Sequence, residues 1–207
     1  YGWGNNSFKQ TAMPKINEQQ IKKEGIKKLG AGVQYSVVLT KENNLIAWGS
    51  TMASRLNIIP PSLKGKVVDF ATNPINILVI KDDGSIELIG VLGAENSTKM
   101  PEELKDGSVK VKKVALTSST AAALDENGKL YVWGPTRDKL SDTNIPKFDA
   151  KLVDIQGSDS VLTALDENGK IYQWGKDNYG ELNTPDGEYS SIYSSYFNNY
   201  AVKEDGK

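Results

Sequence analysis

An eleven-residue phrase occurs twice in this chain, and the repetition constrains the fold more than any other feature. Residues 124–134 read LDENGKLYVWG, and residues 165–175 read LDENGKIYQWG. Looser copies occupy residues 39–49 (LTKENNLIAWG) and 80–90 (IKDDGSIELIG), and a truncated copy, VKEDGK, occupies residues 202–207. A chain that repeats one supersecondary unit at a nearly fixed period is predicted to fold as a repeat array.

Two markers recur in phase along the sequence. The position that ends each phrase before its glycine is Trp3, Trp48, Ile89, Trp133 and Trp174, with spacings of 45, 41, 44 and 41 residues. A proline follows each of these positions by 11–13 residues: Pro14, Pro60, Pro101, Pro146 and Pro185. We therefore predict one domain over residues 1–207, made of five tandem repeats: 4–49, 50–90, 91–134, 135–175, and 176–207 together with 1–3.

Each repeat is predicted to consist of short antiparallel strands. Asp125, Asn127 and Gly128 form a hairpin turn, because Gly supplies the positive φ that a tight turn needs. The turn joins strands at residues 121–124 and 129–133, and a further β-run is predicted upstream, as at residues 67–70 and 152–155. Helix is predicted only at residues 18–29 and 101–105.

Units of about 40 residues with three or four strands are typical of propeller blades, and a β-solenoid is the competing architecture. The predicted fold class is all-β, a β-propeller of about five short blades. The sequence opens with YGWG, which is the strand that the final VKEDGK lacks. We expect residues 1–4 to pair with residues 200–203 and close the ring; the alternative is an incomplete seven-bladed propeller.

Composition excludes several classes of chemistry. The chain has no Cys and no His, which excludes thiolate nucleophiles, disulfides, Cys/His zinc sites and imidazole acid–base catalysis. Its net charge of −1 provides no basic field for nucleic acid, and no apolar run is long enough to span a bilayer. We predict no enzymatic activity, no cofactor, no nucleic-acid partner and no membrane insertion, and favour an extracellular or cell-surface location.

Clustered polar residues have a simpler explanation than catalysis or metal binding. Asp125 with Asn127, and Asp166 with Asn168, superficially suggest calcium loops, but the bidentate Glu at the expected offset is missing. Turn chemistry accounts for them, and no metal site is predicted. The carboxylate pairs at residues 82–83 and 102–103 are adjacent in sequence and are not evidence of a shared catalytic cleft.

The repeat resembles the regulator of chromosome condensation repeat family. The resemblance rests on Gly32, Tyr35, Ser36, a turn and then Trp48-Gly49, and on residues 174–185 (WGKDNYGELNTP), which are similar to bacterial members. It covers essentially the whole chain and implies a propeller, usually of seven blades. The family's His position is occupied by other residues here: Tyr35, Asn76, Thr120, Val161 and Asn198.

The resemblance implies a binding role more than an activity. Guanine nucleotide exchange, the activity of the family's founding member, needs a wedge-like hairpin and a basic tail that we do not find. The repeat length is also similar to that of bacterial propeller proteins that inhibit β-lactamases. We predict a non-catalytic, secreted protein-binding module, in the form of an inhibitor or a receptor-binding element; the alternative is a lectin-like propeller that binds surface glycans.

Two sequence features suggest where the partner binds. Residues 189–200 concentrate Tyr and Phe among Ser and Asn, a composition typical of recognition surfaces. The alternative is that these rings pack between blades. The loops after each Trp-Gly (residues 5–10, 50–56, 135–140 and 176–179) differ between repeats, as specificity loops on a repeated frame would. The predicted partner-binding residues are Tyr35, Met52, Arg55, Arg137, Asn178, Tyr179, Tyr193, Tyr196 and Phe197.

Overall fold

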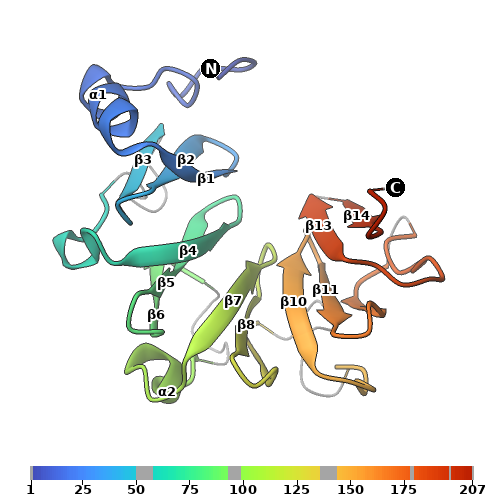
Figure 1. Ribbon diagram of the computed structural model, residues 1–207. Coiled ribbons are helices and arrows are strands. Elements are labelled where there is room, and N and C mark those ends of the chain that lie inside the picture. Colours follow the sequence, from blue (N-terminus) through green and yellow to red (C-terminus); the bar gives the residue numbers. More distant parts are fainter. Residues whose placement is uncertain are drawn as a thin grey trace. The chain divides into compact units, whose positions relative to one another are not determined.

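The protein is all-β apart from two helices and one 3-10 turn in its described residues (Figure 1). The computed structural model describes residues 2–49, 58–92, 99–135, 144–177, 180–195 and 197–206. The chain divides into two compact units, Tyr1–Val91 and Leu92–Lys207. Each unit is a succession of small antiparallel sheets, five in total within the described residues, which confirms the predicted all-β class.

The first unit holds the first and second sheets. Its helices are α1 (Lys15–Glu24) and the 3-10 turn η1 (Pro61–Leu63). The first sheet has the order β1-β2-β3 and the second β4-β5-β6. Their strands are β1 (Ile26–Ala31), β2 (Tyr35–Thr40), β3 (Leu45–Gly49), β4 (Val67–Thr72), β5 (Asn76–Lys81) and β6 (Ile86–Gly90).

The second unit holds the third, fourth and fifth sheets, with one helix, α2 (Glu102–Lys105). The third and fourth sheets have three strands each, whereas the fifth has two, β13 and β14. The strands are β7 (Val111–Leu116), β8 (Ala121–Asp125), β9 (Leu130–Trp133), β10 (Leu152–Gly157), β11 (Val161–Asp166), β12 (Ile171–Gly175), β13 (Ser191–Ser195) and β14 (Asn198–Val202).

The repeated Asp-Glu-Asn-Gly phrase forms the predicted hairpin turns. The Asp125 carboxylate accepts hydrogen bonds from the backbone N–H groups of Asn127 at 2.8 Å and Lys129 at 2.9 Å. Asp166 does the same in the fourth sheet, and the glycine of each turn has a positive φ of 81–85°. The Asp side chain thus closes its own turn, as Asx turns do, which explains the acidic repeat without a metal.

The Trp-Gly end of each third strand is fixed by backbone crowding. Gly49, Gly90, Gly134 and Gly175 have φ values of 117–133°, which favour glycine. A Cβ on Gly134 would lie 2.6 Å from the carbonyl oxygen of Ser119, and one on Gly49 would lie 2.4 Å from that of Gln34. Glycine is therefore required where the third strand leaves its sheet.

Neighbouring sheets within a unit pack face to face. In the first unit, Val37 and Leu39 of the first sheet share one apolar cluster with Phe70 and Val79 of the second. In the second unit, Ala122 and Leu124 of the third sheet lie in a cluster with the fourth sheet, including Trp174. Alternate residues of a strand point to opposite faces of its sheet. Each middle strand therefore has apolar side chains on both faces.

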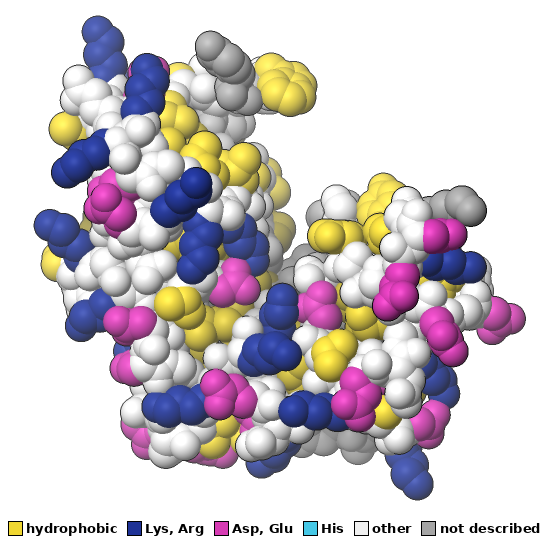
Figure 2. All heavy atoms as spheres, viewed as in Figure 1, with side chains coloured by type: hydrophobic (Ala, Val, Ile, Leu, Met, Phe, Trp, Pro, Cys, Tyr) yellow, Lys and Arg dark blue, Asp and Glu magenta, His cyan; other side chains and the backbone are white. Residues whose placement is uncertain are grey.

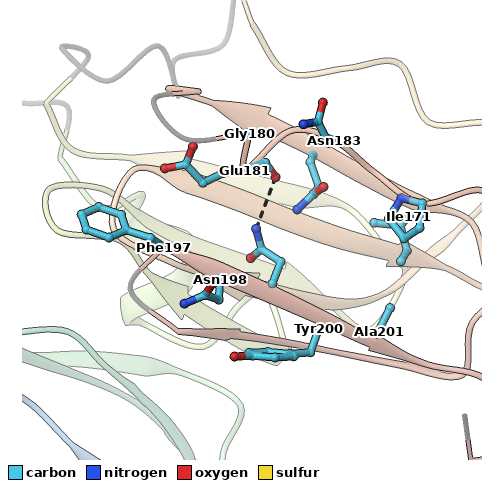
Figure 3. Close-up of a pocket in the computed structure, with 11 residues that line it drawn as sticks. Ile171, Gly180, Glu181, Asn183, Phe197, Asn198, Tyr200 and Ala201 are labelled. Atoms are coloured by element: carbon cyan, nitrogen blue, oxygen red, sulfur yellow. Dashed lines mark hydrogen bonds between the residues drawn. The ribbon is translucent and has the colours of Figure 1, made fainter.

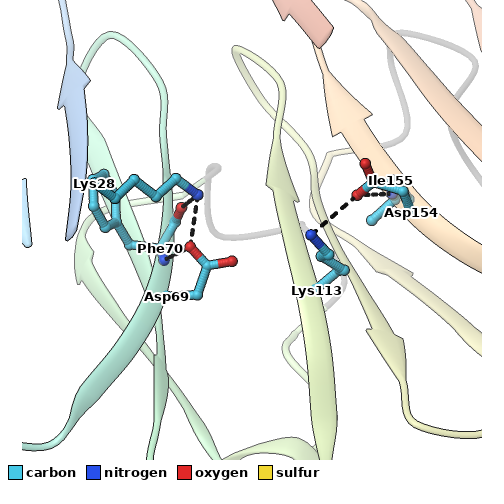
Figure 4. A network of polar contacts seen from close by, with 6 residues as sticks. All are labelled: Lys28, Asp69, Phe70, Lys113, Asp154 and Ile155. Atoms are coloured by element: carbon cyan, nitrogen blue, oxygen red, sulfur yellow. Dashed lines mark hydrogen bonds and ion pairs between the residues drawn. The ribbon is translucent and has the colours of Figure 1, made fainter. Parts of the chain in front are cut away.

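Successive first strands also carry paired charges (Figure 4). In the first unit the Lys28 Nζ lies 2.6 Å from the Asp69 carboxylate and donates to the Phe70 carbonyl at 2.7 Å. In the second unit the Lys113 Nζ lies 3.7 Å from the Asp154 carboxylate. All four residues occupy the third position of their strand. Each ion pair is partly exposed and contributes modestly to stability.

The helix predicted at residues 18–29 is wrong in its bounds. Helix α1 covers Lys15–Glu24 and ends at Gly25, whose φ is 74°, and Ile26 begins strand β1. The strand forms because β1 pairs along its length with β2, an interaction that local sequence does not reveal. Ile21 of α1 packs on Val38, Ile46 and Trp48, so the helix covers one face of the first sheet.

Ring closure stays a prediction. Residues 2–4 belong to no strand in the structure, and Trp3 is 87% exposed, whereas Trp48, Trp133 and Trp174 are buried. Strand β14 pairs only with β13 among the described residues.

We predict that Gly134→Ala destabilises the protein far more than Gly65→Ala. Both glycines have a positive φ, but a Cβ on Gly65 meets no atom within 4 Å. The left-handed conformation alone should cost about 1 kcal/mol, and the added collision at Gly134 should bring its loss to about 3 kcal/mol. Chemical denaturation of both variants measures the difference, and equal losses would contradict the crowding at Trp-Gly.

The Glu24 carboxylate links α1 to the first sheet through hydrogen bonds. It accepts hydrogen bonds from Thr40 Oγ1 at 2.7 Å, Asn44 Nδ2 at 2.9 Å and Gln20 Nε2 at 3.0 Å. Partial burial by itself raises the pKa of Glu24, but these hydrogen bonds outweigh it and hold the pKa below its ordinary value of 4.5.

Glu24→Ala is therefore expected to lower the unfolding free energy by about 1 kcal/mol at pH 7. Because the folded-state pKa is depressed, the contribution of Glu24 is complete above pH 4.5 and is lost as the pH falls through the folded pKa. The matched control is Glu18→Ala, which removes a solvent-exposed ion pair with Lys22 and should leave the unfolding midpoint nearly unchanged. A Glu24 effect that persists at pH 2 would show that the carboxylate is not its source.

Candidate functional site

The fifth sheet exposes one face that carries two large aromatic side chains. Strands β13 and β14 pair Ser191 with Val202, Tyr193 with Tyr200, and Ser195 with Asn198. These six residues share one face because they alternate along each strand. Tyr193 is 57% and Tyr200 59% exposed, and Phe197, in the turn between the strands, is 37% exposed. We call Tyr193, Tyr200, Ser195, Asn198 and Phe197 the tyrosine face.

The opposite face of the fifth sheet is anchored on the fourth sheet. Ile192 is buried, and the Asn199 Oδ1 accepts hydrogen bonds from Ser194 Oγ at 2.7 Å and Thr163 Oγ1 at 3.5 Å. The Asn199 Nδ2 donates to the carbonyl oxygen of Glu181 at 3.4 Å. This anchoring holds the tyrosine face outward on a packed element rather than on a loop.

Equivalent positions of the other sheets show how unusual the tyrosine face is. Counting back from the hairpin turn, Tyr200 corresponds to Val37, Leu78, Ala122 and Thr163, all of which are buried. Tyr193 corresponds, by its strand partner, to Gly30, Ala71, Ala115 and Gln156. At both positions the fifth sheet thus has a larger side chain than the other four sheets, and both tyrosines are exposed.

The residue at the Tyr193 position varies in size among the other sheets. A Cβ on Gly30 would lie 2.5 Å from the Phe70 ring of the second sheet, whereas Gln156 occupies the equivalent position of the fourth sheet. Tyrosine is larger than the residue that any other sheet has there.

A hollow of about 260 Å³ lies beside the outer edge of β14 (Figure 3). Strand β12 contributes Ile171 and Gln173, and the loop after it contributes Glu181 and Asn183. The other wall is formed by residues 197–201. Gln173 is held in place, since it donates to Thr163 Oγ1 and accepts from Thr184 Oγ1. Within the described part of the chain, the side-chain amides of Asn183 and Asn198 have no hydrogen bond.

Charged side chains flank the site. On the side of the molecule shown in Figure 2, basic and acidic side chains lie among one another. Glu181 lines the hollow, and next to the tyrosine face the Lys203 ammonium lies 5.7 Å from the Tyr189 ring centroid. The described residues contain no group of three or more acidic side chains that could hold a metal, and none of their helices is long and apolar enough to cross a membrane.

Tyr35, predicted to contact a partner, is a core residue. It is 3% exposed, and its hydroxyl donates toward the carbonyl oxygens of Asn73 at 2.9 Å and Asn76 at 2.8 Å. Burial raises the pKa of Tyr35 well above its ordinary range. The interface assignment of Tyr35 does not fit this position, because a side chain enclosed by its own unit presents no surface to a partner.

The other predicted residues divide into two groups. Tyr193 lies on β13 and Phe197 in the turn that follows it, and both are exposed. Six lie outside the described residues: Met52, Arg55, Arg137, Asn178, Tyr179 and Tyr196. The structure adds Tyr200, Asn198 and Asn183, which the prediction omitted; the pairing of Tyr193 with Tyr200 could have been found by counting back from VKEDGK to the hairpin partner.

Comparison with known proteins gives similarity in structure alone. No family model and no curated protein sequence matches the chain. Among solved structures, the CRINKLY WD40 ectodomain of the Arabidopsis thaliana receptor kinase ACR4 is similar at a TM-score of 0.69 and 16% identity, covering 98% of this chain and 67% of that one.

Two further structures agree with this similarity. The ectodomain of the Physcomitrella patens receptor kinase CR4 has a TM-score of 0.66 at 13% identity, covering 87% of this chain and 50% of that one. Yeast RCC1 (Prp20), solved with Kap60, has a TM-score of 0.58 at 16% identity, covering 77% and 45%. The chain spans about half the length of these two proteins. At such identities the likeness shows the fold alone, and these similar structures are β-propellers.

The different roles of Tyr35 and Tyr193 can be tested on stability. Tyr35→Ala should cost about 3–5 kcal/mol, because it removes a buried ring and its hydrogen bonds. Tyr193→Ala should cost less than about 1 kcal/mol, since more than half of its surface is already in water. Urea denaturation of the two variants provides the comparison, and a large loss at Tyr193 would identify it as a packing residue.

Proposed function

We propose that this chain is a non-catalytic protein-binding module whose tyrosine face contacts the partner. One observation carries the proposal: Tyr193 and Tyr200 stand exposed and side by side at positions where each of the other four sheets has a smaller side chain. Paired tyrosines flanked by Ser and Asn provide rigid contact area and adaptable hydrogen bonds, as protein recognition surfaces do.

The similar structures support a binding role. Yeast RCC1 was solved bound to Kap60, and the two plant proteins are ectodomains of receptor kinases. An inhibitor or a receptor-binding element is the specific form that we propose for this chain. Either would act by covering a partner surface, which requires no catalytic group.

Carbohydrate binding is the second candidate. It is favoured by the hollow, where Asn183 and Asn198 place amides near the rings of Phe197 and Tyr200. Amides that bond to hydroxyls, together with aromatic faces for stacking, would suit a sugar. The hollow is formed by the fifth sheet and its neighbour, so this candidate predicts one glycan site there rather than equivalent sites in every repeat.

The proposal is tested by capturing a partner with the intact chain and measuring its affinity for variants. Tyr193→Ala and Tyr200→Ala should each weaken binding about 30-fold, the equivalent of about 2 kcal/mol for an aromatic anchor. The matched control is Phe8→Ala, which removes another partly exposed ring, in the first unit.

Unchanged affinity in both tyrosine variants would overturn the assignment of the tyrosine face. Loss of binding after the partner's glycans are removed enzymatically would favour the carbohydrate candidate instead.

A further inference from the structure

Asparagine is followed by glycine at two places in the chain, Asn127-Gly128 and Asn168-Gly169. Both pairs lie in hairpin turns with the same local sequence, LDENGK, and both asparagines are exposed. Such a pair is open to a spontaneous reaction, because glycine has no Cβ to shield its backbone nitrogen from the asparagine side chain. Since the local sequences are identical, a difference in reactivity between the two asparagines has to come from the folded structure.

The reaction is deamidation, and its only co-reactant is water. The Gly128 nitrogen gives up its proton to solvent and attacks the Asn127 Cγ, which forms a C–N bond and closes a succinimide ring. The bond between Cγ and Nδ2 breaks, and the amide nitrogen takes up a proton and leaves as ammonia. Water then opens the ring at either carbonyl. The product is aspartate, or isoaspartate where the chain continues through the side chain.

In both turns a hydrogen bond restrains the attacking nitrogen. The Gly128 N–H donates to the carbonyl oxygen of Asp125 at 3.1 Å, and the Gly169 N–H donates to that of Asp166 at 3.0 Å. Each aspartate also accepts bonds from two N–H groups of its own turn. An N–H group that is hydrogen-bonded keeps its proton, so the nitrogen reacts only after the turn has opened locally. The rate at each site therefore depends on the free energy of that local opening.

The turn of the fourth sheet is restrained by additional side chains. The Tyr172 hydroxyl donates to Asp166 Oδ2 at 2.9 Å and accepts a hydrogen bond from the Asp149 N–H at 3.0 Å. The Tyr172 ring is held by an edge contact with Phe148, with ring centroids 5.2 Å apart. The Lys170 Nζ lies 2.5 Å from Asp149 Oδ2. Opening of this turn breaks the hydroxyl bond to Asp166 in addition to the bonds that the two turns share.

The turn of the third sheet lacks the equivalent hydroxyl bond. Tyr131 occupies the position of Tyr172, but within the described residues no hydrogen bond joins its hydroxyl to Asp125. The Lys129 ammonium lies 4.4 Å from the Tyr131 ring centroid instead. The Asp125 carboxylate is therefore held by its own turn alone.

The glycine carbonyls of the two turns differ in the same direction. The Gly169 carbonyl accepts a hydrogen bond from the Tyr189 N–H at 2.9 Å, and Gly169 is buried. Gly128 is half-buried and lies against the Lys151 side chain, but no N–H group of the described part of the chain donates to its carbonyl. Local opening therefore costs less free energy at Asn127.

We infer that Asn127 is a site of spontaneous deamidation, and that Asn168, in the same local sequence, is protected by the Tyr172 and Tyr189 hydrogen bonds of its turn. The inference is independent of the proposed function. The new carboxylate at position 127 lies beside those of Asp125 and Glu126, and like charges repel one another. The isoaspartate form also adds a carbon atom to the backbone of the turn. Both products therefore weaken the hairpin of β8 and β9.

The test follows both asparagines by peptide mapping and mass spectrometry while the intact chain is kept in mildly alkaline buffer. Asn127 is expected to convert at least about tenfold faster than Asn168, because its turn opens more readily. In concentrated urea, which unfolds both turns, the two rates should be equal, because the local sequences are the same.

Tyr172→Phe tests the cause of the protection, since it removes the hydroxyl and keeps the ring. Asn168 should then convert about tenfold faster, the effect of losing a hydrogen bond to a charged group, while the rate at Asn127 is unchanged. Tyr131→Phe is the matched control and should change neither rate. The comparison of the unaltered chain in buffer and in urea decides the inference even if Tyr172→Phe does not fold.

Equal rates in the folded chain, or faster conversion of Asn168, would overturn the inference. The same ratio of rates in urea as in buffer would also overturn it, because the difference would then lie in the sequence and not in the structure. An unchanged rate at Asn168 in a folded Tyr172→Phe variant would refute the protection by the Tyr172 hydroxyl.

Discussion

The third strand of each sheet is the constraint on which the structure depends. It ends in Trp-Gly or Ile-Gly, and at Gly49, Gly90 and Gly134 the glycine passes so close to the neighbouring strand that no side chain fits. The residue before the glycine lies opposite the middle strand, and in the fourth sheet this residue, Trp174, is buried against the third sheet. A sheet of three strands therefore has two faces on which neighbouring sheets can pack.

The fifth sheet departs from this rule twice. It has two strands within the described residues, which leaves the β14 edge and a hollow where the others have a third strand. It also exposes Tyr193 and Tyr200, whereas the residues that correspond to Tyr200 in the other sheets are buried. Both departures occur on an element anchored by Asn199 and Ile192, so the exposed groups are held in place before a partner arrives, which lowers the entropic cost of binding.

The sequence alone predicted the features that depend on contacts between residues close together in the chain. The Asp125 and Asp166 turns follow from residues that bond to their own backbone. The division of the chain into five repeats stays a prediction. The start of β1 at Ile26 did not follow, because its pairing with β2 outweighs the helical pattern that runs through residues 18–29. The burial of Tyr35 did not follow from the sequence for the same reason: its acceptors are the carbonyl oxygens of Asn73 and Asn76, 38 and 41 residues away in the chain.

The tyrosine-rich composition of residues 189–200 was visible in the sequence, whereas its division into an exposed and a buried face depended on the register of β13 and β14. Tyr193 was identified and its partner Tyr200 was not, since only the pairing places them together. The hollow was beyond sequence reasoning, because its walls come from two sheets and an intervening loop.

The central claim is that the fifth sheet binds a protein partner through the tyrosine face. Hydrogen–deuterium exchange of the intact chain, with and without the captured partner, tests it most directly. We expect slower exchange in residues 191–202 on binding, and unchanged exchange in the hairpin turns at Asn127 and Asn168. Protection confined to the first unit, with residues 191–202 unaffected, would contradict it.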